Sequence, residues 1–146
     1  MSQKNKSINN EEVQRKSIKY DGEDLYIQVD NYWINNCLYV GVFTDNGEPY
    51  ADVTVNLGNR PSMDPKFAYL SGDISSELTE VLKKNKVFKD LNHPVSVNFG
   101  VYRMIELNID TLRKFDPKGL EKALNIPIDD INIDEVGVID NTKVSI

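Results

Sequence analysis

Residues 50–57 constrain the fold most, because their two faces differ along the whole stretch. Successive side chains of a β-strand leave opposite faces, so an alternation of apolar and polar residues predicts a half-buried strand. The preceding Asp45-Asn46-Gly47 is typical of a tight hairpin turn, which predicts antiparallel pairing with residues 37–44. The apolar phase consists of Ala51, Val53, Val55 and Leu57, and the polar phase of Tyr50, Asp52, Thr54 and Asn56.

Further segments extend the predicted sheet. A long alternating segment runs from Val95 to Ile109, and Gly100 in its middle predicts a bulge or a turn that divides it into two strands. We therefore expect a mainly antiparallel sheet of about five or six strands. The other predicted strands cover residues 25–30, 37–44, 50–57 and 67–70.

Two segments have a helical period instead. Asp73 or Ser75 can cap the first helix, and three lysines near its end complement the helix dipole. Asp116-Pro117 opens a short second helix that ends at Asn125. The predicted class is therefore α+β, with one amphipathic helix packed on a face of the sheet and a short C-terminal helix. The apolar stripe of the first helix consists of Ile74, Leu78, Val81 and Leu82.

The two ends of the chain differ from its middle. Residues 1–16 are polar, without aromatic residues, and predict a disordered basic arm that is dispensable for folding. Residues 17–125 form the predicted single α+β domain. Residues 126–146 form an acidic C-terminal extension, and their weak alternation leaves an added strand and a loose tail both open.

Charge and composition limit the function classes. The chain has 146 residues and a net charge of −6. It contains no apolar run near the ~20 residues that cross a bilayer, and its first residues lack the apolar core of a signal peptide. We therefore expect a protein of the host cytosol without a membrane partner. A negative field repels nucleic-acid phosphates and attracts basic protein surfaces, so we expect no direct nucleic-acid binding.

The segment Glu48-Pro49-Tyr50-Ala51-Asp52-Val53-Thr54-Val55-Asn56-Leu57 resembles the signature of an uncharacterised bacterial domain family. That family is found on plasmids, conjugative elements and phages of Gram-positive bacteria. Residues 100–107 resemble the Gly-containing strand with which its members end. The resemblance covers about residues 24–115 and implies a short α+β fold. It implies no catalytic or ligand-binding residue, because the family has no assigned chemistry.

No catalytic or metal-binding set stands out in the sequence. Cys37 is the only cysteine and His93 the only histidine. Cys37 heads an apolar strand and His93 precedes Pro94 at a strand entrance, so we expect a core residue and a surface residue. Residues 130–134 imitate the start of a calcium-binding loop, but its sixth position holds Glu135 instead of glycine. We therefore expect no cofactor, no metal and no enzymatic activity.

The candidate partner-binding residues are aromatic and acidic. Tyr32 and Trp33 lie in an Asn-rich loop, where an exposed ring would anchor a protein partner. We expect Trp33 to fold back as a lid on the core, but both states remain open. Arg103 is an edge residue, an ion-paired core residue or a binding residue. The acidic group that would steer a basic partner consists of Asp129, Asp130, Asp134 and Glu135.

Two function classes remain. The first is a non-enzymatic protein-binding inhibitor that a phage or mobile element uses against a host defence nuclease. Its partner would be a basic host protein, such as a CRISPR effector or another nucleic-acid enzyme, whose nucleic-acid groove an acidic protein can occupy. The second is an accessory or regulatory protein of the element that binds a small molecule or has weak enzymatic activity.

Overall fold

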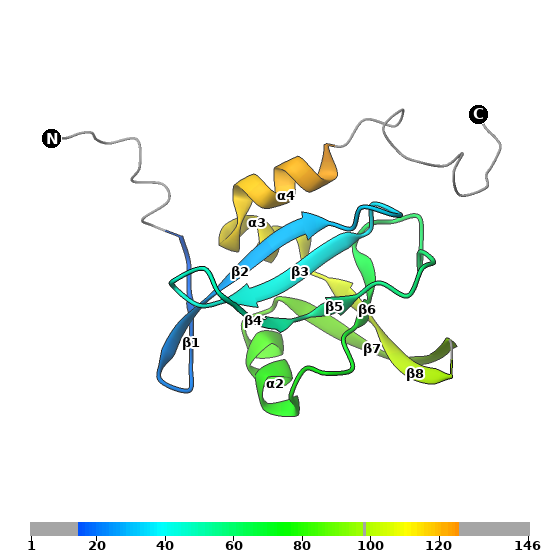
Figure 1. Cartoon of the computed structure of the whole chain (residues 1–146), viewed down its shortest axis with the longest axis horizontal. Helices are drawn as coiled ribbons and strands as arrows, with labels where there is room; N and C mark the ends of the chain where they lie inside the picture. Colours follow the sequence, from blue (N-terminus) through cyan, green and yellow to red (C-terminus); the bar gives the residue numbers. More distant parts are fainter. Residues whose placement is uncertain (1–14, 98, 126–146) are drawn as a thin grey trace, which may run out of the picture.

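The protein consists of two four-stranded antiparallel sheets and three helices in the part of the chain that the structure describes (Figure 1). The structure is a computed structural model, and it describes residues 15–97 and 99–125. The α+β class predicted from the sequence is confirmed. The strands divide between two sheets, whereas the sequence predicted one sheet of five or six strands.

The first sheet has the strand order β1-β2-β3-β4. Its central pair is the β2–β3 hairpin, in which Ile27 faces Val42 and Val29 faces Val40. All four of these side chains are buried. The strands of this sheet are β1 (Ile18–Tyr20), β2 (Glu23–Asn31), β3 (Leu38–Phe43) and β4 (Pro49–Asp52).

The second sheet has the strand order β5-β6-β8-β7. The β7–β8 hairpin turns between Val97 and Gly100, as Gly100 predicted, and its far end projects from the body of the molecule (Figure 1). A bulge interrupts its register between Asp90 and His93. The strands of this sheet are β5 (Thr54–Val55), β6 (Phe67–Leu70), β7 (Phe88–Val97) and β8 (Gly100–Leu107).

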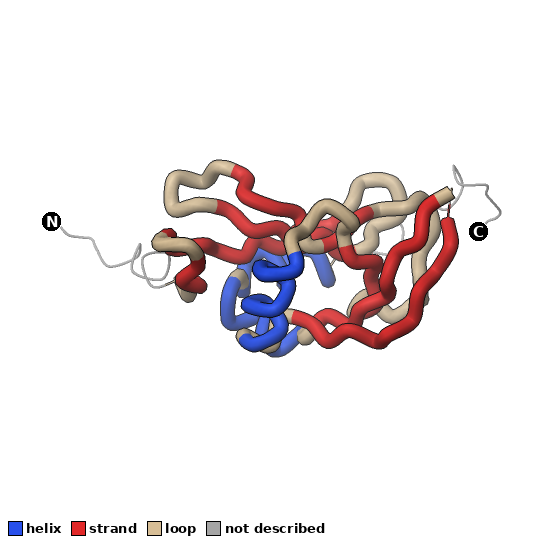
Figure 2. Tube along the Cα trace, turned by 90° about the horizontal axis from the view of Figure 1, so that it is seen from below, coloured by secondary structure: helices blue, strands red, loops and turns tan. Residues whose placement is uncertain are grey.

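Figure 2 shows the helices in projection near the middle of the molecule, and Figure 1 separates them, with α3 and α4 beside β2 and α2 at the opposite side of the strands. The Ser75 side chain caps α2 by accepting from the Leu78 N–H, and Asp116 caps α4 by accepting from the Gly119 N–H. Helix α2 packs against β7, and α3 and α4 pack against β2 and each other. No helix in the described ranges is long and apolar enough to span a membrane. The helices are α2 (Ser76–Lys84), α3 (Ile109–Phe115) and α4 (Pro117–Leu124).

The predicted strand 50–57 is divided at Val53, and this corrects the sequence interpretation. The Val53 N–H donates to the Val40 carbonyl of β3 (2.9 Å), and the Val53 carbonyl accepts from the Ser71 N–H that follows β6 (2.8 Å). Val53 thus joins the two sheets. Thr54 is as deeply buried as Val53, although the alternation placed it on the polar face. The chain changes sheets here, so the two residues point into one shared core.

The hydroxyl of Thr54 satisfies a backbone group at this junction. It accepts from the Val40 N–H (3.1 Å) and is hydrogen-bonded to the Tyr32 hydroxyl (3.0 Å). Val40 therefore bonds the crossing chain through both its N–H and its carbonyl. A buried N–H without a partner would cost about 1–3 kcal/mol.

Side chains close the edge of β2 that β1 leaves open. β1 pairs with β2 only at residues 23–25. Further along this edge, the Asp116 carboxylate accepts from the Val29 N–H (2.9 Å), and the Arg15 guanidinium donates to the Ile27 carbonyl. The same guanidinium donates to the Phe115 carbonyl at the end of α3 (3.3 Å). These contacts join the helical layer to the sheet without an additional strand.

Two further elements differ from the sequence interpretation. Residues 109–115 form α3, whereas the alternation predicted that a strand would continue to Ile109. The Asn108 side chain caps this helix by accepting from the Thr111 N–H, and its buried residues are Leu112 and Phe115. The spacing of Ile109, Leu112 and Phe115 was the helical signal. Strand β1 was not predicted, because its three residues are too few to show an alternation.

Gly119→Ala is expected to destabilise the protein by about 1–3 kcal/mol, because overpacking at a close contact forces a backbone shift. An added Cβ would clash with the Val29 carbonyl and with the Asp116 carboxylate. Gly72→Ala is the matched control, since its Cβ would meet nothing nearer than the Tyr102 ring at 3.9 Å. Urea denaturation followed by circular dichroism measures both. Equal stability of the two variants would contradict the close packing of α4 on β2.

Truncation tests where the folded part begins. A chain that starts at Arg15 is expected to match the full chain, whereas one that starts at Ser17 loses about 1–2 kcal/mol but still unfolds cooperatively. The loss reflects the hydrogen bonds of Arg15 and the stacking of the Lys16 ammonium on the Phe115 ring (5.5 Å). Arg15→Ala in the full chain should reproduce most of this loss of unfolding free energy. Loss of cooperative unfolding from Ser17 would show that residues 1–16 are needed to fold.

Candidate functional site

A hydrogen-bonded turn between β2 and β3 presents Trp33. The Tyr32 N–H donates to the Cys37 carbonyl (2.8 Å), and the Asn36 N–H donates to the Tyr32 carbonyl (2.9 Å). Asn36 has a φ of 57°, a left-handed conformation that asparagine adopts more readily than most residues. The asparagines of this loop therefore serve its backbone geometry.

Asn35 fastens this turn to the loop between β5 and β6. Its side-chain NH₂ donates to the side-chain oxygen of Asn56 (3.0 Å), and its side-chain oxygen accepts from the Cys37 N–H (3.1 Å). The Arg60 guanidinium donates to the Asn35 carbonyl (2.7 Å) and to the Met63 carbonyl (3.4 Å). Figure 1 shows the two loops side by side. One guanidinium thus holds both backbones in place.

Three large apolar side chains are exposed on these two loops. Trp33 is 83% exposed, Ile34 56% and Met63 85%. We call these three residues the apolar loop surface. The expectation that Trp33 covers the core as a lid is wrong, because the turn is held by hydrogen bonds of Tyr32, Asn35 and Asn36 and the indole remains in solvent.

Tyr32 has a different environment from its neighbour Trp33. Its ring is half-buried and meets the Tyr39 ring edge-on, with centroids 5.6 Å apart. Burial raises the pKa of the Tyr32 phenol, and the hydrogen bond with Thr54 partly offsets this effect. Burial also raises the pKa of Tyr39, whose hydroxyl donates to the Asp52 carboxylate (2.8 Å). Both phenols stay neutral near pH 7, so Tyr32 supports the surface while Trp33 is its exposed part.

The acidic residues predicted to steer a partner lie outside the described residues; these are Asp129, Asp130, Asp134 and Glu135. Other carboxylates occur beside the apolar loop surface. Asp30 is near the end of β2, Asp52 ends β4 below the Tyr39 hydroxyl, and Asp64 follows Met63. All three are exposed. Exposed carboxylates therefore occur on segments that adjoin the two loops, and one of them, Asp64, lies 3.9 Å from the Lys66 ammonium.

The structure does not bring Cys37 and His93 into one site. Cys37 precedes β3 in the first sheet, whereas His93 is exposed on β7 of the second sheet and faces Met104. Burial raises the pKa of the Cys37 thiol, which disfavours the nucleophilic thiolate. Within residues 15–97 and 99–125, no group of three His, Cys, Asp or Glu side chains is placed to hold a metal ion. The calcium-loop-like residues 130–134 lie outside these ranges.

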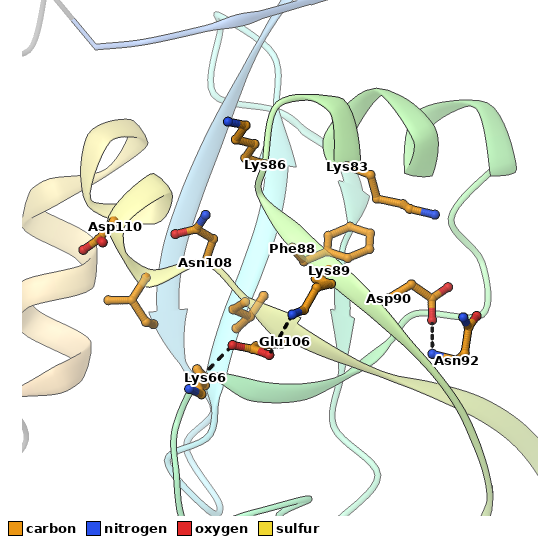
Figure 3. A pocket seen from close by; sticks show the side chains of 12 residues that line it. Lys66, Lys83, Lys86, Phe88, Lys89, Asp90, Asn92, Glu106, Asn108 and Asp110 are labelled. Atoms are coloured by element: carbon orange, nitrogen blue, oxygen red, sulfur yellow. Dashed lines mark hydrogen bonds and ion pairs between the residues drawn. The ribbon is translucent and has the colours of Figure 1, made fainter.

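A lysine-lined cavity of about 810 Å³ lies between α2, β7 and the start of α3 (Figure 3). The local sequence patterns did not indicate this cavity, because Lys66 and Glu106, which it brings together with Lys89, come from distant parts of the chain. Its floor includes the buried side chains of Phe88 and Leu107. Its basic residues are Lys66, Lys83, Lys86 and Lys89.

Arg103 lies on β8 and forms an ion pair across to the bulge of β7. Its guanidinium contacts the Asp90 carboxylate (2.8 Å) and donates to the Asn92 side chain (3.2 Å), while its own side chain is half exposed. Burial by itself raises the pKa of Asp90, but the Asn92 N–H, the Arg103 guanidinium and Lys83 outweigh burial and lower it. Of the three roles that the sequence left open, the structure shows the ion pair, near the surface.

Comparison with known proteins identifies one domain family. A family described as a domain of unknown function, DUF4313, matches residues 26–126. The match confirms the resemblance at the level of an uncharacterised domain, and it reaches through α4, beyond the resembling residues 24–115. No curated protein and no solved structure matches the chain.

Substitutions in the turn should separate Tyr32 from Trp33. Trp33→Ala is expected to change the free energy of unfolding by less than about 0.5 kcal/mol, since its side chain is in solvent. Tyr32→Phe is expected to cost about 1 kcal/mol, because it removes the hydrogen bond with the buried Thr54 hydroxyl. Urea denaturation followed by circular dichroism suits both variants, as Trp33 is the only tryptophan. A larger loss in Trp33→Ala than in Tyr32→Phe would contradict this assignment.

Proposed function

Since the chain belongs to the DUF4313 family, whose function is unknown, we propose a function from its own surface. The protein is a non-enzymatic protein-binding inhibitor, encoded by a phage or mobile element, that acts on a host defence nuclease. The observation that carries this proposal is the exposure of Trp33, 83%, on a turn that hydrogen bonds hold in one conformation. The mobile-element origin rests on the family resemblance.

An exposed indole on a fixed turn suits a binding anchor. Tryptophan contributes more binding energy in protein interfaces than most residues, typically from the centre of a desolvated patch. Ile34 and Met63 beside it would extend the contact. The turn and the loop of Met63 are already joined by Asn35 and Arg60, so little conformational entropy is lost on binding.

The charge of the protein indicates the chemistry of the partner. The chain carries −6, and Asp30, Asp52 and Asp64 are exposed on segments that adjoin the two loops of the apolar loop surface. A surface of this kind complements a basic face with an apolar pocket, and opposite charges accelerate the encounter. Channels that hold nucleic acid have such basic faces, and CRISPR effectors are an example. The inhibitor would occupy the channel in place of nucleic acid.

The test is capture of a partner from a host lysate, followed by binding kinetics with the purified partner. Trp33→Ala should speed dissociation by about 30-fold, since a hot-spot aromatic contributes about 2 kcal/mol or more. Replacing Asp129, Asp130, Asp134 and Glu135 by their amides should instead slow association, mainly at low ionic strength. The captured partner should be a basic nucleic-acid enzyme.

Phe99→Ala is the matched control for the anchor. Phe99 is fully exposed on the turn of the β7–β8 hairpin, away from the apolar loop surface, and its loss should leave the kinetics unchanged. Equal dissociation rates for wild type, Trp33→Ala and Phe99→Ala, with the fold intact, would contradict the proposed interface. Capture of no nucleic-acid enzyme would contradict the proposed class of target.

The lysine-lined cavity favours a second candidate function. A cavity of about 810 Å³ is within the size range of small-molecule sites. An accessory protein of a mobile element that binds a small molecule would use such a site. A rise in melting temperature with a metabolite would support this candidate.

A further inference from the structure

The lysine-lined cavity brings together positive charges from three separate segments. Lys66 precedes β6, Lys83 and Lys86 belong to the end of α2 and the turn after it, and Lys89 is on β7. In Figure 3 the side chains of Lys66 and Lys89 converge on Glu106, while Lys83 and Lys86 come from the end of α2 and the turn after it. None of the three residues of the apolar loop surface lines this cavity, so the two sites are separate.

The carboxylates near the cavity do not match its lysines one for one. Glu106 is shared between Lys66 (3.5 Å) and Lys89 (3.8 Å). The other two acids of the lining, Asp90 and Asp110, pair with arginines outside the lining at 2.8 and 3.3 Å. Each of those two acids therefore has an arginine partner of its own.

The remaining acids lie outside the lining. Glu80 pairs with Lys83 (3.2 Å), and Asp64 lies 3.9 Å from Lys66. No ion pair joins Lys86 to a carboxylate within the described residues. The cavity thus has an excess of positive charge in a protein that carries −6.

Two asparagines add neutral donors to the lining. The side-chain oxygen of Asn92 accepts from Arg103 (3.2 Å), and that of Asn108 accepts from the Thr111 N–H (3.2 Å). Because these oxygens are engaged in the fold, the amide NH₂ groups are what each side chain can offer a ligand. The set available to a ligand is therefore ammonium and amide donors.

A ligand could replace the carboxylates that now pair with these lysines at a small cost in free energy. The side chains of Lys66, Lys83 and Lys89 are between a third and three-quarters exposed, and ion pairs of exposed groups are worth little. A phosphate offers several oxygens to the same donors, and a concave site concentrates the positive field. A long nucleic acid would in addition meet the negative field of the whole protein.

We propose that this cavity binds a small molecule that carries two or more linked phosphate groups. The phosphates contact Lys66, Lys86 and Lys89, and Asn92 and Asn108 donate to the remaining oxygens. Free pyrophosphate and the phosphate chain of a nucleoside triphosphate share this chemistry.

Calorimetric titration of the full chain with pyrophosphate and with ATP tests the proposal. We expect saturable binding that weakens as salt is raised. The double variant Lys86→Ala with Lys89→Ala should weaken it by about tenfold or more, since two charge-assisted contacts are lost. Glu106→Gln should tighten it several-fold, because the competing carboxylate is removed. The matched control is Lys84→Ala, which changes a neighbouring lysine of α2 that does not line the cavity.

Comparison of the two ligands and a nucleic acid identifies the source of the phosphates. Equal affinity for pyrophosphate and ATP would assign recognition to the phosphates alone, and tighter binding of ATP would add a contact to the nucleoside. Tighter binding of short single-stranded DNA than of either would overturn the proposal in favour of a nucleic-acid backbone site.

Two other results would also overturn it. One is the absence of saturable binding of both ligands to the folded protein. The other is an equal loss of ligand affinity in Lys84→Ala and in the double variant, which would show that the general charge of the surface, and not the cavity, determines binding. Unchanged melting temperatures of the variants confirm that the fold is intact. Capture of a partner through Trp33 is measured separately, so either proposal can fail without the other.

Discussion

The exchange of strand partners at Val53 and Thr54 is the constraint on which the rest of the structure depends. Within two residues the chain leaves β3 of the first sheet and joins β6 of the second. Both N–H and carbonyl of Val40 remain bonded, because the Thr54 hydroxyl accepts where a strand carbonyl would. Without the Thr54 hydroxyl, the buried Val40 N–H would lack a hydrogen-bond partner at the centre of the core.

The same junction positions the candidate binding surface. The Thr54 hydroxyl bonds Tyr32, and Asn56, two residues further along, bonds Asn35. The turn that carries Trp33 is therefore fastened to the chain just after it changes sheets. An exposed aromatic residue on a loop is common, but one held from two sides is already ordered before any partner arrives.

Much of the fold could be predicted from local patterns. The β3–β4 hairpin, the Ser75 cap of α2 and the Asp116 cap of α4 follow from turn residues, alternation and capping chemistry, which act between near neighbours. The division of residues 50–57 and the helix at 109–115 could not be predicted in this way. Thr54 is buried because of what the neighbouring strands offer it, and the alternation carries no information about those strands.

The sequence by itself determined the α+β class, the capped helices, the hairpins and the acidic charge, since these depend on period, turn residues and composition. Only the tertiary structure decided that Trp33 is exposed and that four lysines surround one cavity. Lys66 and Lys89 are distant in sequence and meet at Glu106 because β6 and β7 both pair with β8. Such a site depends on the order of strands in the sheet, and no local pattern of residues specifies that order.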